Sequence, residues 1–167
     1  YTTLFRSPAW LTQATHTCTH AHSHAQGGGD LPHCLTNAST ARTAHATQLH
    51  SLGLHDLALQ ATFRSIECAH RAHASAPTFR AASLAVSIYE DKAVATTGNP
   101  ASCAQLKVAM LQLGGLALDQ CVRALPLGVS VGEVETLARK CEGLLTELPT
   151  LPEVSFISLL FSYECLV

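Results

Sequence analysis

The sequence predicts an all-α protein, either an irregular helical bundle or a fragment of an α-solenoid, preceded by a disordered N-terminal segment. Three observations favour this class. From residue 39 onward, apolar and small residues recur at the spacing of one helix face. Gly, Pro and Asn interrupt this pattern where turns between helices are needed. Ser130 and Glu133 have the spacing of a capping box, in which two side chains satisfy free backbone amides at a helix start.

The first two expected helices cover 39–52 and 54–75. We expect Ser39 to cap the first helix and Gly53 to stop it, because these residue types favour those positions. Pro77 is expected to end the second helix, since proline cannot continue the hydrogen-bond ladder. The second helix carries one face of mostly small residues, Leu57, Ala58, Ala61, Ser65, Cys68, Ala69 and Ala72.

Two longer helices are expected over 79–95 and 101–125, with a turn at 98–100 between them. Gly114 and Gly115 lie inside the second of these, where each glycine costs about 1 kcal/mol relative to alanine. A kink or a close contact with another helix is therefore expected there. The expected buried positions are Ala81, Leu84, Ala85, Ile88 and Tyr89 in the first helix, and Leu106, Ala109, Met110, Leu113, Ala117, Cys121 and Ala124 in the second.

A fifth helix follows the capping box over 131–148, and Pro149 stops it. Val129 and Val134 have the spacing of the hydrophobic staple that accompanies such a start. The apolar stripe of this helix is Val134, Leu137, Ala138, Cys141, Leu144, Leu145 and Leu148. The final segment, 154–167, is almost wholly apolar and suits a helix or a buried strand equally well. Because an exposed apolar end favours aggregation, we expect that the chain is cut there.

The N-terminus has a different character. Its first seven residues, YTTLFRS, resemble the translation of a common short-read sequencing adapter. The resemblance implies a translated read from environmental or transcript DNA. The alternation of histidine with small residues over 15–24 is similar to a translated CA repeat. We therefore expect a disordered or artefactual segment over 1–38 and a helical domain over 39–167, truncated at both ends.

Composition excludes several functional classes. Charged residues make up 13% of the chain, and the net charge is −2 with no clustered Lys/Arg stripe, which disfavours binding to polyanions. Seven scattered cysteines do not suggest a disulfide framework and fit reduced thiols. Neither a signal peptide nor a long uninterrupted apolar run is recognisable, so an intracellular location without a membrane partner is favoured.

The early histidines offer a possible metal site. Imidazole and thiolate are good ligands for zinc, nickel and copper, and the alternation would place these side chains on one face of a strand. A second pair of ligands held by the fold is missing, and a Gly-rich spacer follows at 27–29. Weak, adventitious binding is therefore favoured over an evolved site. The candidate residues are His16, Cys18, His20, His22 and His24.

Two passages resemble helical-repeat families. A tetratricopeptide-like spacing is carried by Leu49, Leu52, Gly53, Ala69, Ala72 and Pro77. The segment 152–163 is similar to the first helix of a pentatricopeptide repeat, a family that binds single-stranded RNA. The resemblances imply a helical scaffold or interaction protein whose partner is another protein or the remainder of its parent chain. The alternative is a misframed or non-functional open reading frame.

Two further alternatives concern residues 106–137. Ala124, Gly128, Val129, Ser130, Val134 and Leu137 resemble the packing positions of a helix-turn-helix DNA-binding module. Glu133 and Glu135 at the start of its recognition helix would repel phosphates. The same stretch resembles the entrance of methionine-aminopeptidase-like metallopeptidases, whose metal ligands would lie beyond residue 167. Cys68, His70 and His73 share a helix without facing one another as nucleophile and base. We therefore expect no catalytic residue and no cofactor.

Overall fold

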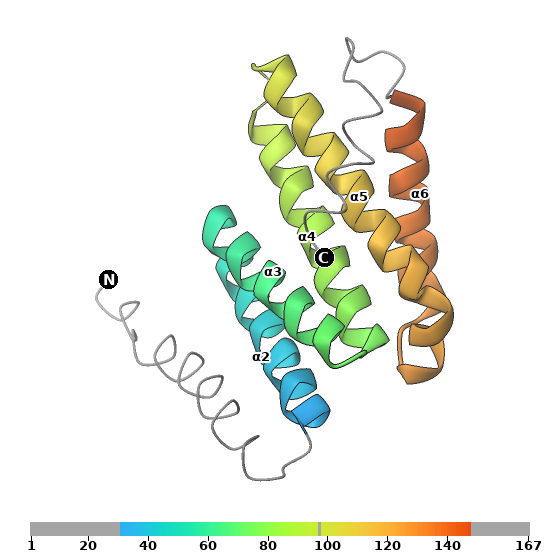
Figure 1. Ribbon diagram of the computed structural model, residues 1–167. Helices are drawn as coiled ribbons and strands as arrows, with labels where there is room; N and C mark the ends of the chain where they lie inside the picture. The colour runs from blue at the N-terminus through green and yellow to red at the C-terminus, as the bar shows by residue number, and fades with distance from the viewer. Residues whose placement is uncertain (1–30, 97, 148–167) are drawn as a thin grey trace, which may run out of the picture.

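The structure, a computed structural model, describes residues 31–96 and 98–147. These ranges contain five α-helices and one short 3-10 helix, without a strand, which confirms the predicted all-α class (Figure 1). The elements are α2 (Leu31–Ser51), α3 (His55–Arg71), α4 (Ser75–Ala95), α5 (Pro100–Ala124), the 3-10 helix η2 (Leu125–Leu127) and α6 (Val131–Glu147).

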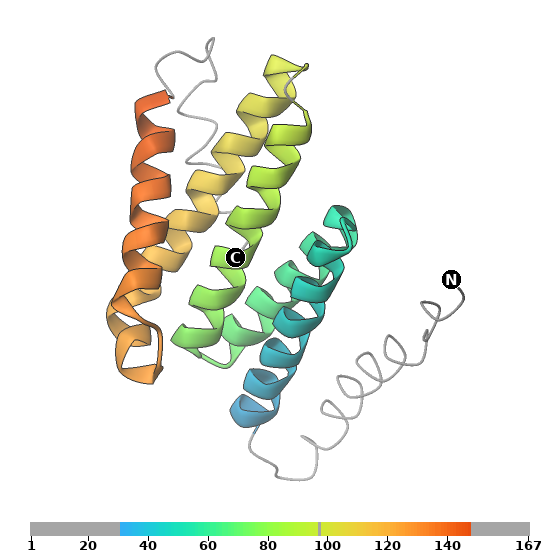
Figure 2. The ribbon, with the colours of Figure 1, turned by 180° about the vertical axis from the view of Figure 1, so that it is seen from behind.

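Helices that follow one another in the chain lie side by side. α2 and α3 form one helical hairpin, α4 and α5 form a second, and α6 packs against α5 (Figures 1 and 2). α4 joins the two hairpins, because it contacts α3 and α2 on one side and α5 on the other. Short connections impose this arrangement, since a few residues between helices leave only an antiparallel neighbour within reach.

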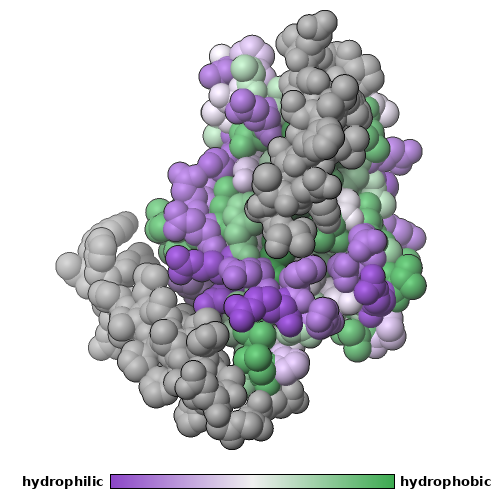
Figure 3. Space-filling model, viewed as in Figure 1, coloured by the Kyte–Doolittle hydropathy of each residue, from purple (hydrophilic) through white to green (hydrophobic). Residues whose placement is uncertain are grey.

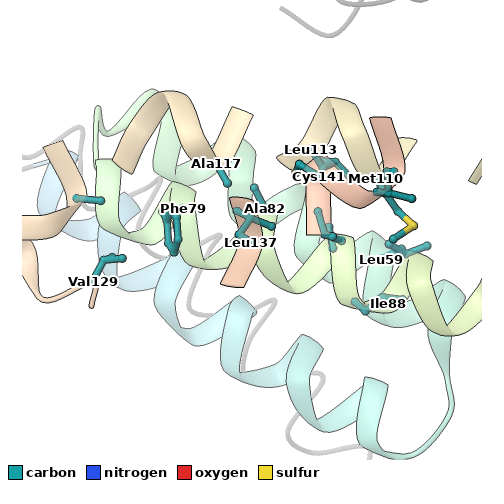
Figure 4. Packing of buried hydrophobic residues seen from close by; sticks show 14 of the residues in the cluster. Leu59, Phe79, Ala82, Ile88, Met110, Leu113, Ala117, Val129, Leu137 and Cys141 are labelled. Carbon is teal, nitrogen blue, oxygen red and sulfur yellow. The ribbon is translucent and has the colours of Figure 1, made fainter. Parts of the chain in front are cut away.

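The hydrophobic core is centred on α4. Phe79, Val86 and Ile88 are its largest fully buried apolar side chains. Figure 4 shows Leu137 of α6 beside Ala82 of α4 and Ala117 of α5, while Met110 and Leu59 lie near Ile88. Alanine fills many of the remaining contact positions, so the helices pack through small side chains with few aromatic rings between them. Ala82, Ala85, Ala117 and Ala124 are all fully buried.

The contact between α2 and α3 is polar at its centre. Ser39 and Ser65 are fully buried, and their Oγ atoms lie 2.8 Å apart. The Ser65 hydroxyl also donates to the Ser39 carbonyl oxygen at 2.8 Å, and Thr43 Oγ1 lies 2.7 Å from Ser65 Oγ. Ser39 is thus an interior residue of α2, and its predicted role as an N-cap is wrong. The domain boundary expected between residues 38 and 39 falls inside this helix.

Ser65 of α3 forms hydrogen bonds with both Ser39 and Thr43 of α2. We expect Ser65→Ala to lower the free energy of unfolding by about 1–3 kcal/mol, because the buried Ser39 hydroxyl loses its acceptor. Urea denaturation followed by circular dichroism measures this change. Thr40→Ala is the matched control, because Thr40 is an exposed hydroxyl residue of α2 outside this buried contact. This substitution should change the free energy of unfolding by no more than about 0.5 kcal/mol. Equal effects of the two substitutions would contradict this account.

The turns between helices correct two predictions. α3 ends at Arg71 and not at residue 75, because His73 adopts a left-handed conformation with φ 52°. The amide of His73 donates to the His70 carbonyl, and the amide of Ala74 donates to the Ala69 carbonyl, which completes a Schellman cap. Pro77 lies in the first turn of α4, where its missing N–H has no helical partner to lose. Pro77 therefore starts a helix and does not end one.

Gly53 confirms the predicted end of the first helix. It has φ 74°, and its amide donates to the carbonyl of His50 at 2.9 Å. Asn99 caps α5 by accepting from the amide of Ser102 at 3.2 Å, with Pro100 as the next residue. The predicted turn at 98–100 thus also begins a helix in the expected place.

α6 begins with the predicted capping box. The Ser130 amide donates to Glu133 Oε2 at 2.7 Å, and the Glu133 amide donates to Ser130 Oγ at 3.2 Å. The adjoining Val129 is buried. In the predicted stripe, Leu137, Cys141 and Leu144 are buried. Leu145 is 55% exposed, so its inclusion in the stripe was wrong; Leu148 and the segment 154–167 lie outside the described residues.

α5 meets α6 closely at Gly114. A Cβ atom at Gly114 would overlap Sγ of Cys141, whereas a Cβ at the exposed Gly115 would meet no atom within 4 Å. The close helix contact expected at this glycine pair is therefore present at one of the two positions. Pro100–Leu127 is the one helical stretch of the described chain long and apolar enough to cross a membrane. Met110, Leu113 and Ala117 of this stretch are buried in the core, whereas only 28% of its most apolar window is buried in all.

The two glycines provide a matched pair of substitutions. We expect Gly115→Ala to raise the free energy of unfolding by about 1 kcal/mol, because alanine restricts the unfolded backbone and faces open space. Gly114→Ala should lower it by about 1–3 kcal/mol, since the added methyl overpacks the contact with Cys141. Urea denaturation of both variants decides this point, and changes of the same sign would contradict the observed packing.

Candidate functional site

A groove lies between α2, α4 and α6, which are alternate helices along the chain. It is an open depression with a volume of about 620 Å³. α4 forms its floor, and α2 and α6 form its two walls. The lining residues are Thr43 and Thr47 of α2, Phe79, Arg80, Ser83, Leu84, Val86 and Ser87 of α4, and Ser130, Gly132, Glu133, Thr136, Leu137 and Lys140 of α6 and its cap.

Hydroxyl groups dominate the groove walls. Thr47 donates to the carbonyl of Thr43 at 3.0 Å, and Thr136 donates to that of Gly132 at 2.7 Å. Each hydroxyl donates its hydrogen bond within its own helix, so its oxygen lone pairs remain available as acceptors in the groove. Ser83 differs from them, because its Oγ is buried yet has no hydrogen-bond partner among the described residues. A buried hydroxyl without a partner is uncommon in folded proteins.

The charges in the groove are largely balanced. Arg80 Nη2 donates to the Gly128 carbonyl at 2.7 Å, which ties α4 to the turn before α6. Lys140 forms an ion pair with Glu90 of α4. Hydrogen bonds from the Ser130 amide, and then from its hydroxyl, lower the pKa of Glu133, with a smaller contribution from the charge of Arg80. The groove therefore offers no excess of positive charge to a polyanion.

The lowered pKa of Glu133 makes the stability of α6 depend on pH. A carboxylate whose folded pKa lies below its unfolded value, about 4.3, stabilises the fold above that value, and the stabilisation is lost as the pH falls through the folded pKa. We expect Glu133→Gln to reduce the loss of stability between about pH 5 and pH 3. Glu135→Gln, on the same helix but outside the capping box, should keep the wild-type profile. Urea denaturation over this pH range tests the prediction, and parallel profiles for all three proteins would refute it.

The metal-site candidates His16, Cys18, His20, His22 and His24 lie outside the described residues. Of the three residues considered for nucleophilic chemistry, none lines the groove, and His70 is exposed on α3. Cys68 is buried, with its Sγ 2.6 Å from Arg42 Nη1, and His73 forms the left-handed turn residue after α3.

The helix-turn-helix positions are part of the packing between α5 and α6. Ala124 and Val129 are buried in the core, and Ser130 is engaged in the capping box. The Val129 amide donates to the Ala124 carbonyl at 3.4 Å, so these residues close the turn around η2. Their pattern is accounted for by this turn.

Sequence reasoning missed the groove residues. Ser83 and Ser87 lie among alanines on α4 and carry no local motif, and Thr136 resembles any exposed helix residue. The only local signal was the capping box, which positions the start of α6 without indicating that α6 faces α2. Figure 3 shows a band of hydrophilic side chains across the face of the molecule on which α3 lies. Two exposed residues of α3, Arg64 and Glu67, carry opposite charges.

Comparison with known proteins finds no match, whether among protein-family models, curated proteins or solved structures. The candidate site consequently rests on its own geometry.

Proposed function

We propose that this protein is a helical scaffold that binds a polypeptide segment of a partner protein in the groove between α2, α4 and α6. The observation that carries the proposal is the groove itself, whose two walls present the exposed hydroxyl groups of Thr47 and Thr136. The half-buried Leu84 adds apolar surface from α4, so the groove combines apolar contact with a few fixed polar groups. That combination is typical of binding sites that are formed before the ligand arrives.

The hydroxyl chemistry favours a polypeptide over a nucleic acid. Thr47 and Thr136 offer acceptor lone pairs, which suit the N–H donors of a peptide backbone or of side-chain amides. Phosphate oxygens only accept hydrogen bonds and need donors or positive charge instead. The charged groups Arg80 and Lys140 already have partners in Gly128 and Glu90. A protein partner therefore suits the groove better than RNA or DNA.

The same lining favours binding without catalysis. Of the described residues, those that line the groove include no histidine or cysteine. A serine or threonine hydroxyl needs an adjacent general base to act as a nucleophile. Here the neighbouring carboxylate, Glu133, accepts hydrogen bonds within the capping box, which keeps it ionised and occupied. We accordingly propose an interaction protein without catalytic activity.

A peptide-display selection on the full chain tests the proposed function. Peptides that bind wild type are expected to bind Thr136→Arg at least about tenfold more weakly, because the long side chain fills the groove from α6 without entering the core. Thr47→Val should weaken binding by about fivefold, which is the contribution of one neutral hydrogen bond. Fluorescence anisotropy with labelled peptides measures both changes.

The matched control is Thr146→Arg, which makes the same change on α6 at an exposed residue outside the groove lining. It should alter peptide affinity by less than about twofold. Peptides that bind wild type and Thr136→Arg equally well would refute the groove as the binding site. If the chain binds single-stranded RNA and Thr136→Arg binds it more tightly than wild type, the nucleic-acid alternative is supported, because the substitution adds positive charge.

A further inference from the structure

Two histidines face each other at the turn between α2 and α3, away from the groove. His50 is in the last turn of α2 and His55 is the first residue of α3. Their Nδ1 atoms lie 3.4 Å apart, and the two rings are inclined at 58° with centroids 5.4 Å apart. On the other side of the His50 ring, Nε2 lies 3.4 Å from Oδ2 of Asp91 on α4. Three helices thus contribute to one small cluster.

The Schellman turn at Gly53 sets the spacing of this pair. The amide of Gly53 donates to the His50 carbonyl, and the amide of Leu54 donates to the Leu49 carbonyl at 3.0 Å. Because these bonds fix the path of the chain between His50 and His55, the two rings are held opposite each other by the backbone. The His50 side chain is 20% exposed, so the cluster lies at the surface with limited access to water.

The separation of the two nitrogens also suits a metal ion. At 3.4 Å the Nδ1 atoms form a long hydrogen bond, beyond the usual heavy-atom distances of about 2.7–3.2 Å, which an ion can replace. Two imidazole nitrogens that each lie about 2.0–2.1 Å from a tetrahedral metal are separated by about 3.3–3.4 Å. The nitrogens of His50 and His55 are therefore already at the distance that such an ion would require.

We propose that His50 and His55 form a two-histidine site for a borderline divalent transition-metal ion such as Zn²⁺ or Cu²⁺, with Asp91 orienting the ring of His50. Imidazole nitrogen is a preferred ligand of these ions. A metal-bound histidine usually has a carboxylate beside its second ring nitrogen, and Asp91 Oδ2 lies 3.4 Å from Nε2 of His50, within ion-pair distance. The described residues hold no group of three or more potential ligands, so water would complete the coordination. The site is independent of the proposed peptide groove.

The surrounding charges permit a cation to approach. Lys92 of α4 is the nearby positive charge, and its Nζ is held by Asp56 Oδ1 at 2.5 Å. Asp56 directly follows His55 in the chain and, with Asp91, gives two carboxylates against one ammonium in this region. An incoming ion would bind the unprotonated Nδ1 atoms of the two rings.

Thermal unfolding of the full chain with and without Zn²⁺ tests this site. Because the ion joins two helices of the folded state, the midpoint should rise by about 3–6 °C at a Zn²⁺ concentration near ten times the dissociation constant. His50→Gln and His55→Gln should each abolish the rise. Asp91→Asn should require roughly tenfold more Zn²⁺ for the same shift, as expected for loss of the orienting carboxylate.

Two controls separate this site from other histidines. His73→Gln should keep the full shift, since His73 lies at a different turn. A full-length variant with glutamine at positions 16, 20, 22 and 24 should also keep it. Loss of the shift in that variant, or its persistence in both His50→Gln and His55→Gln, would overturn the proposal. If His50→Gln fails to fold, the His55→Gln and Asp91→Asn titrations decide the question.

Discussion

α4 contacts α5, its partner in the second hairpin, and also α2 and α3 of the first hairpin. On its buried faces, alanine and serine outnumber large apolar residues. Ala82 and Ala85 are completely buried there, and Gly114 of α5 leaves room for the Cys141 side chain of α6. Small side chains let helix backbones approach closely, so dispersion between main chains replaces much of the contact that leucine or phenylalanine usually makes. The positions of all five helices depend on this close approach, since one added methyl group at such a contact has nowhere to go.

Buried hydroxyls add specificity to a core with few large side chains. Flat alanine faces could slide along one another, but the bonds among Ser39, Thr43 and Ser65 are satisfied in only one register of α2 against α3. A shift by one turn would leave buried hydroxyls unpaired, which costs more than the loss of one apolar contact. The low charge content of the sequence is thus compensated inside the protein by hydrogen bonds between short polar side chains.

The groove and the histidine pair are consequences of the same helical arrangement. Alternate packing brings α2, α4 and α6 to one side, where Thr47 of α2 and Thr136 of α6 line the two walls of the groove. At the end of α2, the tight turn at Gly53 brings His50 and His55 together over Asp91. Binding of a partner in the groove and of an ion at the turn would involve different helix ends, so neither proposal requires the other.

The sequence by itself determined the helices and several of their ends. The capping box at Ser130, the left-handed Gly53 and the Pro100 start are local, because each satisfies or omits a backbone hydrogen bond within a few residues. Tertiary structure decided the rest. Ser39 has the residue type of a helix cap, but in the folded chain it lies inside α2, where α3 supplies Ser65 as its hydrogen-bond partner. The groove and the contact between His50 and Asp91 bring together residues that are dozens of positions apart in the sequence. Periodicity shows which face of a helix is apolar, but it carries no information about which other helix that face meets.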